Sequence, residues 1–132
     1  MASKVAIIEF DKDKEKEAIT RTLKLLGIQR DLRVSQRPVV VKVGVFSHKV
    51  GNHTSVRVVD AIASLFEKAP KIMLTESDNY QGTGTERLQL WKELFTDRVV
   101  PINLSDDLEP VKMTLAGQEI NMPRLLLEPK VL

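Results

Sequence analysis

Short apolar runs alternate with amphipathic segments over most of this chain. Four of the runs carry the β-branched and aromatic residues that strands prefer: Lys4–Phe10, Val39–Phe46, Lys71–Glu76 and Arg98–Leu104. The second run follows Pro38 and is apolar at nearly every position except Lys42, which is typical of a parallel strand covered on both faces. The pattern therefore predicts four strands, separated by helical segments.

Three helices are predicted between these strands. The first spans residues 11–27, with Ile19, Leu23 and Leu26 at helical spacing and Gly27 as its C-terminal cap. The second spans residues 54–69, and its apolar stripe is formed by Val58, Ile62, Leu65, Phe66 and Ala69. The third starts at a capping box of Thr83 and Glu86 and is expected to bury Leu88, Trp91 and Phe95.

Strands separated by helices predict an α/β fold, with a mostly parallel sheet and helices on both faces in a three-layer αβα arrangement. A C-terminal β-hairpin is predicted from Val111 to Met122 around Ala116 and Gly117, appended to the sheet or extending from it. The chain is long enough for one domain, residues 1–132. It closes on an apolar strand start at Val131 and Leu132, so we expect it to be the N-terminal part of a longer protein.

Composition narrows the functional classes. The 132 residues include no cysteine, which excludes disulfides, thiolate zinc sites, iron–sulfur ligation and a cysteine nucleophile within this chain. Lysine and arginine exceed aspartate and glutamate by only two and are spread along the chain, so nucleic-acid binding is not expected. Because the N-terminus becomes charged at once and no apolar segment approaches membrane-spanning length, we expect a cytoplasmic protein that does not enter a membrane.

Candidate chemistry gathers after the third predicted strand. Glu76, Ser77 and Asp78 are followed by a loop in which Gly82, Gly84 and Thr85 precede a helix. Glycines there let backbone N–H groups approach an oxyanion, with the positive end of the helix dipole behind them. The alternative is an ordinary helix start. Because two carboxylates would repel an anion, the site would need a nearby cation, and Lys42 on an adjacent strand could supply it.

A divalent metal site is a second hypothesis for this region. His48, His53, Glu76 and Asp78 combine imidazole and carboxylate groups, a ligand set that suits zinc, iron or manganese. The two histidines lie in a loop after the second predicted strand and could reach the end of the third if these strands are neighbours. Alternatively, they are surface residues or cap partners. A general base at His53 would also need a carboxylate to orient its ring.

Four segments in this order resemble the N-terminal half of the family catalogued as domain of unknown function 362: RPVVVKVGVF, NHTSVRVVDAIASLF, KIMLTESDNYQGTGTERL and NMPRLLLEPKVL. Lys42 matches the family lysine, and His53 and Thr54 correspond, in reversed order, to the pair that opens the next helix. Glu76 and Ser77 match the strand-end pair. Val43 and Gly44 stand where proline and asparagine are usual. The resemblance implies a further lysine, histidine and asparagine motif beyond residue 132, and many members also carry a ferredoxin-like cysteine segment.

Three functional classes follow. The first is half of a ligand-binding site for a small anion, or for a metal-dependent ligand, formed by these residues: Lys42, His53, Thr54, Glu76, Ser77, Asp78, Gly82, Gly84 and Thr85. The second, implied by the resemblance, is a redox-associated module that works with an iron–sulfur partner. The third is a structural domain that forms a homodimer through the edge of the hairpin. The reaction, if there is one, is not named by these patterns.

Overall fold

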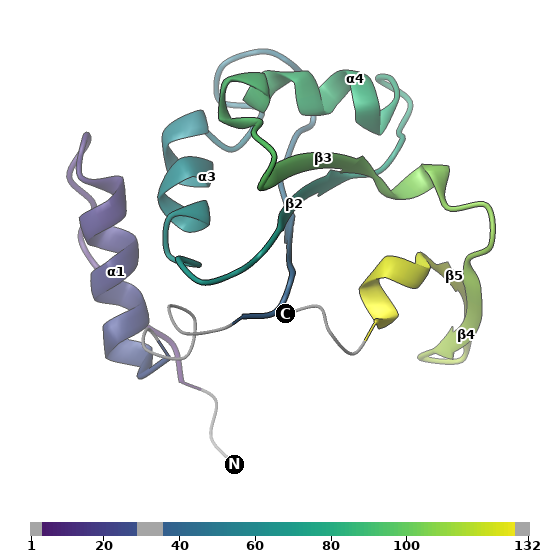
Figure 1. The fold of residues 1–132 in the computed structure, drawn as a ribbon, viewed down its shortest axis with the longest axis horizontal. Helices are drawn as coiled ribbons and strands as arrows, with labels where there is room; N and C mark the ends of the chain where they lie inside the picture. The colour runs from purple at the N-terminus through teal and green to yellow at the C-terminus, as the bar shows by residue number, and fades with distance from the viewer. Residues whose placement is uncertain (1–3, 29–35, 129–132) are drawn as a thin grey trace.

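A parallel sheet in the order β1-β2-β3 forms the centre of the computed structural model, which describes residues 4–28 and 36–128 (Figure 1). Its strands are β1 (Val39–Lys42), β2 (Ile72–Glu76) and β3 (Val99–Asn103). Val39 is aligned with Ile72, and Ile72 with Val99. Because all three strands run in one direction, their carboxyl ends meet at a single edge of the sheet.

In the described residues the remaining elements are three α-helices, one β-hairpin and three 3₁₀ segments. The helices are α1 (Glu15–Leu26), α3 (Val56–Ala63) and α4 (Gly84–Leu88), and the last continues as a 3₁₀ helix over Gln89–Leu94. Strands β4 (Val111–Leu115) and β5 (Gln118–Met122) follow, and 3₁₀ turns lie at Leu104–Asp106 and Arg124–Leu127. The chain is therefore a mixed α/β protein.

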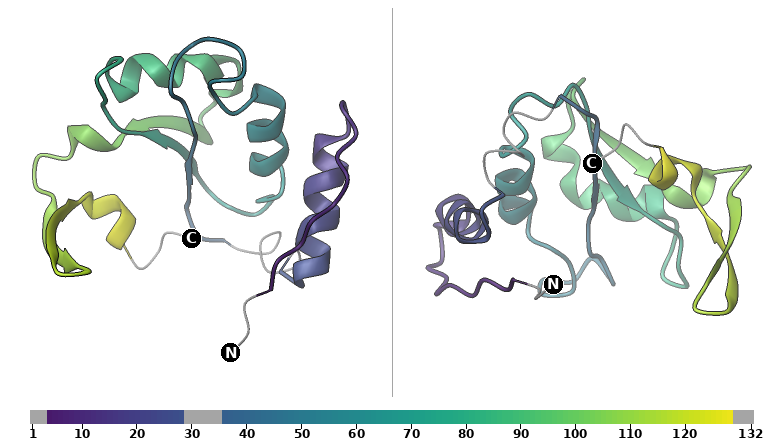
Figure 2. Two further views of the ribbon diagram at one scale, coloured as in Figure 1. Left: turned by 180° about the vertical axis from the view of Figure 1, so that it is seen from behind. Right: turned by 90° about the horizontal axis from the view of Figure 1, so that it is seen from below.

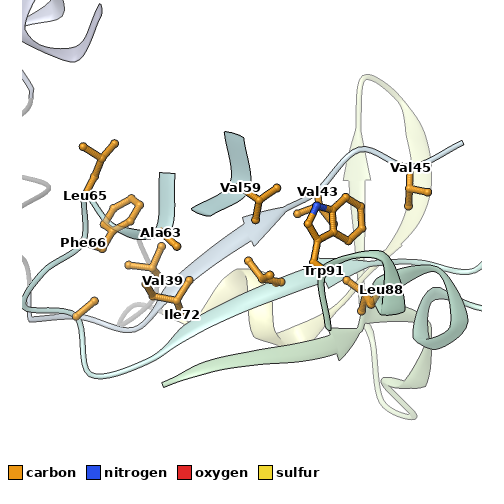
Figure 3. Close-up of a cluster of buried hydrophobic side chains, with 12 residues drawn as sticks. Val39, Val43, Val45, Val59, Ala63, Leu65, Phe66, Ile72, Leu88 and Trp91 are labelled. Atoms are coloured by element: carbon orange, nitrogen blue, oxygen red, sulfur yellow. The ribbon is translucent and has the colours of Figure 1, made fainter. Parts of the chain in front are cut away.

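The central strand β2 is buried along its whole length. Ile72 and Leu74 point to the face on which α3 and α4 pack, where they form one core with these side chains: Val39, Val43, Val45, Val59, Ala63, Leu65, Phe66, Ala69, Leu88 and Trp91 (Figure 3). The prediction that Trp91 is a core residue is confirmed, since its side chain is fully buried. Because α3 and α4 share this face, they do not form the predicted layers on opposite faces of the sheet.

Helix boundaries follow the local capping signals. Thr83 and Glu86 form the predicted capping box of α4, with each side chain bonded to the other residue's backbone N–H. Gly27 ends α1 with φ of 80°, as predicted for a left-handed C-terminal cap. The second predicted helix is shorter than residues 54–69, because α3 ends at Ala63 and the chain continues in turns. In α3 the fully buried valine is Val59 and not Val58.

The predicted strand at Lys4–Phe10 is wrong. This segment has no strand assignment and runs as an extended trace beside α1 (Figure 2). The chain turns sharply before α1, where the Lys14 N–H donates to the Asp11 carbonyl. Helix α1 then packs on α3, and Arg57 of α3 forms ion pairs with Asp13 and Glu15. In this arrangement the segment pairs with no strand of the described residues.

Two further predictions on strands need correction. The strand expected over Val39–Phe46 ends at Lys42, and beyond it Val45 forms only an isolated bridge to His53. Strands β4 and β5 pair antiparallel across Ala116 and Gly117, both with positive φ, but they form a separate two-stranded sheet and do not extend the central one. The strand start expected at Val131 and Leu132 lies outside the described residues.

Candidate functional site

The carboxyl ends of the three parallel strands bring Lys42, Glu76 and Asn103 together. Each is the last residue of its strand, and Glu76 is aligned with Asn103 across β2 and β3. Ser77 and Asp78 follow β2 directly, as the sequence indicated. In open α/β sheets this edge is where loops form ligand sites, because they can vary there without disturbing the core.

Glu76 is the centre of a charged cluster at this edge. Its carboxylate Oε1 lies 2.5 Å from Lys42 Nζ and 3.2 Å from Arg87 Nη2, and it accepts a hydrogen bond of 2.9 Å from the Ser77 N–H. Only 3% of Glu76 is exposed. Burial alone would raise the pKa of Glu76, but the hydrogen bonds from Lys42, Ser77 and Arg87 outweigh it and hold the pKa below its usual value.

Arg87 is the second buried charge of the cluster and was missed by the sequence analysis. It lies on α4 with 3% of its surface exposed, whereas 54% of the Lys42 side chain is exposed. Nη2 reaches Glu76, but Nε and Nη1 have no hydrogen-bond partner within the described part of the chain. Two cations therefore share one carboxylate, and the buried Arg87 alone can balance the charge of Glu76.

Asp78 has a different role from Glu76. Its Oδ1 accepts hydrogen bonds from the Gly84 N–H, at 2.7 Å, and from Asn103 Nδ2, at 3.0 Å. The Asp78 N–H donates to Ser105 Oγ at 2.8 Å. Asp78 thus joins the start of α4 to the end of β3, and these contacts fix the loop between β2 and α4.

Gly84 is required by this close approach. A Cβ placed on Gly84 would lie 2.3 Å from Asn103 Oδ1 and 3.0 Å from the Glu76 carbonyl oxygen. No real Cβ tolerates the first distance. The glycine therefore lets α4 begin directly against the ends of β2 and β3.

The backbone N–H groups predicted to cradle an anion already have partners within the chain. The Gly84 N–H bonds to Asp78, the Thr83 N–H to Glu86 Oε2, and the Gly82 N–H to the Asn79 carbonyl. Thr85 is exposed in the first turn of α4. The chain's own oxygens thus occupy the positions that an external anion would take, which corresponds to the alternative of an ordinary helix start.

His53 faces Trp91, whereas the Thr54 hydroxyl accepts a hydrogen bond of 3.3 Å from the Gly44 N–H, two residues after the end of β1. His53 Nδ1 lies 3.1 Å from the Thr54 carbonyl oxygen, and the His53 ring meets the edge of Trp91 at 6.2 Å between centroids. Trp91 Nε1 donates to the same Thr54 carbonyl at 3.2 Å. These contacts hold the loop after β1 against the core, with His48 exposed in that loop.

The described residues contain no group of three or more histidine, aspartate or glutamate side chains arranged to hold a metal ion. Of the suggested ligands His48, His53, Glu76 and Asp78, the two carboxylates make the internal contacts given above. The metal site predicted from these four residues stays a prediction.

A pocket of about 460 Å³ opens between the strand ends and the β4–β5 sheet. It is lined by Lys42, Ser77, Leu104, Ser105, Asp107, Pro110, Asn121, Pro123 and Leu126. Of these, only Lys42 and Ser77 were predicted as ligand-binding residues. The others belong to the segment after β3, to β5 and to the turn that follows β5. No local pattern in the sequence indicates that these segments approach the strand ends.

Asp107 fixes the far wall of this pocket. Its carboxylate accepts hydrogen bonds from the backbone N–H of Arg124, at 2.5 Å, and of Glu109, at 3.0 Å. These bonds, the first above all, lower the pKa of Asp107. Arg124 Nη2 also pairs with Glu109 Oε2 at 2.5 Å. The segment after β3 is thereby tied to the 3₁₀ turn that carries Leu126.

Comparisons with protein-family models, curated proteins and solved structures found no match to this chain. Among the helices in the described ranges, none combines the length and the apolar character needed to cross a lipid bilayer.

Proposed function

We propose that this domain binds a small organic molecule carrying an acidic group, in the pocket between the strand ends and the β4–β5 sheet. The observation that carries the proposal is the surplus positive charge at Lys42. Arg87 is buried against Glu76 and balances its charge, while Lys42 is half-exposed and lines the pocket. A ligand carboxylate or phosphate at Lys42 would restore neutrality to the cluster.

The composition of the pocket supports a ligand with both polar and apolar parts. Lys42, Ser77, Ser105 and Asn121 offer hydrogen-bonding groups, whereas Leu104 and Leu126 with two prolines form an apolar wall. The negative charge of Asp107, which also lines the pocket, is directed to the backbone N–H groups of Glu109 and Arg124. A volume of about 460 Å³ suits a small molecule, because ligand pockets typically span about 300–1,000 Å³. We therefore favour a small organic acid or phosphorylated compound over a bare inorganic anion.

This proposal uses part of the predicted site and leaves other parts as predictions. Lys42, Ser77 and Glu76 take part, whereas His53 and Gly82 do not line the pocket. The resemblance to the domain of unknown function 362 supports a site completed by residues beyond position 132. A divalent metal, a redox partner and dimerisation through the hairpin edge stay predictions that no contact described above favours.

The test is a thermal-unfolding screen with small carboxylates and phosphorylated compounds, compared between the wild type and Lys42→Gln. A ligand at about a hundred times its dissociation constant stabilises by about 2.7 kcal/mol, which corresponds to a shift on the order of 10 °C here. We expect Lys42→Gln to lose most of that shift and Lys112→Gln, an exposed lysine of β4, to keep it. Equal shifts in the Lys42→Gln variant and the wild type would contradict the proposal, as would no shift with any acid.

A further inference from the structure

The segment Lys4–Phe10 has the sequence of a strand but no strand to pair with in the described residues. Val5 and Ile7 are 82% and 89% exposed, and Phe10 is 54% exposed. The segment contains neither glycine nor proline and is rich in the β-branched residues that strands prefer. An unpaired strand of this kind is a ready partner for an open sheet edge.

A pocket lies between part of this segment and α1. A pocket of about 340 Å³ separates Ile8, Glu9 and Asp11 from α1, where Lys14, Glu17, Ala18 and Arg21 line its other side. Gaps of this size lose the close atomic contacts that hold packed segments together. The pocket therefore leaves part of the segment without close atomic contacts to α1.

The outer edge of β1 offers the backbone groups that such a segment needs. The N–H groups of Val39 and Val43 donate to carbonyls of the β2 side, at 2.9 Å and 3.1 Å. Since backbone direction alternates along a strand, the N–H and C=O groups of Val40 and Lys42 point away from β2. Within the described ranges no strand pairs with them.

The loop that follows β1 and the opposite edge of the sheet, at β3, are less suited to pair with an added strand. Beyond Lys42, the Thr54 N–H donates to the Gly44 carbonyl and the Phe46 N–H to the Asn52 carbonyl, both at 2.8 Å. On the opposite side of the sheet, β3 carries the exposed Pro101. The Ile72 N–H bonds to the Arg98 carbonyl, so even-numbered residues of β3 face β2 and Pro101 faces outward, where it has no N–H to donate. Of the two edges of the parallel sheet, the one at Val40 and Lys42 is thus the better placed to accept a strand.

We propose that Lys4–Phe10 of one copy adds as a strand to β1 of a second copy, and that the exchange is reciprocal. The turn at Asp11–Lys14 and the ion pairs of Arg57 with Asp13 and Glu15 hold the segment beside α1, where it pairs with no strand of its own sheet in the described ranges (Figures 1 and 2). A second copy can reach the segment without breaking these contacts. A two-fold symmetric dimer repeats the same strand addition twice and covers both exposed segments.

Because the chain has no cysteine, single cysteines test the pairing directly. Val40→Cys protein is mixed with each of Val5→Cys, Ile7→Cys and Glu9→Cys, oxidised and examined on a non-reducing gel. Residues opposite each other in paired strands lie close enough for a disulfide. We expect a heterodimeric product with at least one partner and none above background with Leu115→Cys of β4. No product with any of the three would overturn the proposal.

The mass in solution supplies the second test. Sedimentation of the wild type over a range of concentrations is compared with Val5→Lys/Ile7→Lys and with the matched control Leu108→Lys/Leu115→Lys, since all four positions are exposed. We expect a concentration-dependent dimer in the wild type and control, and a monomer in the N-terminal variant. A wild-type monomer throughout would overturn the proposal, as would dimer loss in the control alone, which would indicate the hairpin edge. A disulfide within one chain of Ile7→Cys/Val40→Cys would also overturn it.

Discussion

Lys42 Nζ and Glu76 Oε1 lie 2.5 Å apart across the carboxyl ends of two neighbouring parallel strands. The same carboxylate also meets Arg87 from α4. The two cations therefore differ in their freedom to move. Arg87 is buried and stays beside Glu76, whereas the side chain of Lys42 is half-exposed and can turn toward a ligand.

Glu76→Gln is expected to destabilise the fold strongly. The variant keeps the shape of the side chain but leaves the buried guanidinium of Arg87 without a counter-charge, and breaking a buried pair in this way costs about 3–5 kcal/mol. Urea unfolding followed by circular dichroism measures the loss. Glu119→Gln, on the exposed strand β5, is the matched control and should stay within about 0.5 kcal/mol of the wild type. A loss at Glu76 no larger than at Glu119 would show that the pair is not formed.

Acid should weaken the fold through Glu76. Because its pKa is lowered in the folded state, the unfolded state takes up the proton first as pH falls. The contribution of Glu76 to the free energy of unfolding is therefore complete above the unfolded pKa, about 4.3, and is lost as pH falls from there through the folded pKa. Lys42→Met removes the leading favourable contact of Glu76, so the folded pKa should rise toward the unfolded value, and the acid-induced loss should become smaller and end at higher pH. Unfolding curves between pH 3 and pH 7 test this, and superimposable pH profiles of variant and wild type would contradict it.

Local signals in the sequence predicted the parts of the fold that local contacts stabilise. The capping box of Thr83 and Glu86 and the cap at Gly27 depend on residues a few positions apart. The burial of Trp91 was predicted from its helical spacing with Leu88, although its packing partners are distant in the sequence. The strand at Lys4–Phe10 failed because strand formation needs a partner edge, and the packing of α1 on α3 withholds it. The run of strand-preferring residues in the sequence contains no information on how α1 packs.

The candidate site shows the same division. Glu76 and Ser77 could be predicted because they lie at the end of the strand expected at Lys71–Glu76, whereas Lys42 was predicted only as a cation on an adjacent strand, which was expected to continue to Phe46. Arg87 looks like an ordinary solvent-facing residue of a helix, because its contact with Glu76 joins residues that no periodic pattern relates. The far wall of the pocket depends on the bond between Asp107 and Arg124, seventeen residues apart, which no periodicity indicates.

Gly84→Ala should destabilise the junction of α4 with the sheet. The added methyl group would overlap Asn103 and press on the Glu76 carbonyl, so the helix start must move and the Asp78 hydrogen bond to residue 84 must lengthen. Overpacking of this kind costs roughly 1–3 kcal/mol. Thr85→Ala, one residue further on an exposed position, should change stability little. Equal unfolding midpoints for the two variants would contradict the close approach of α4 to β3.

Trp91→Phe should cost about 1–3 kcal/mol, because it removes a buried donor to the Thr54 carbonyl and part of the core volume. His53→Ala should cost less, since Trp91 still donates to that carbonyl when the His53 ring is removed. Phe46→Leu is the control for losing an aromatic ring, because Phe46 is 52% exposed. Circular dichroism follows unfolding in all three.

Trp91 is the single tryptophan and is fully buried, so acrylamide should quench its fluorescence far less in the native wild type than in urea. Strong quenching in the native protein would place the ring at the surface and contradict the core described above.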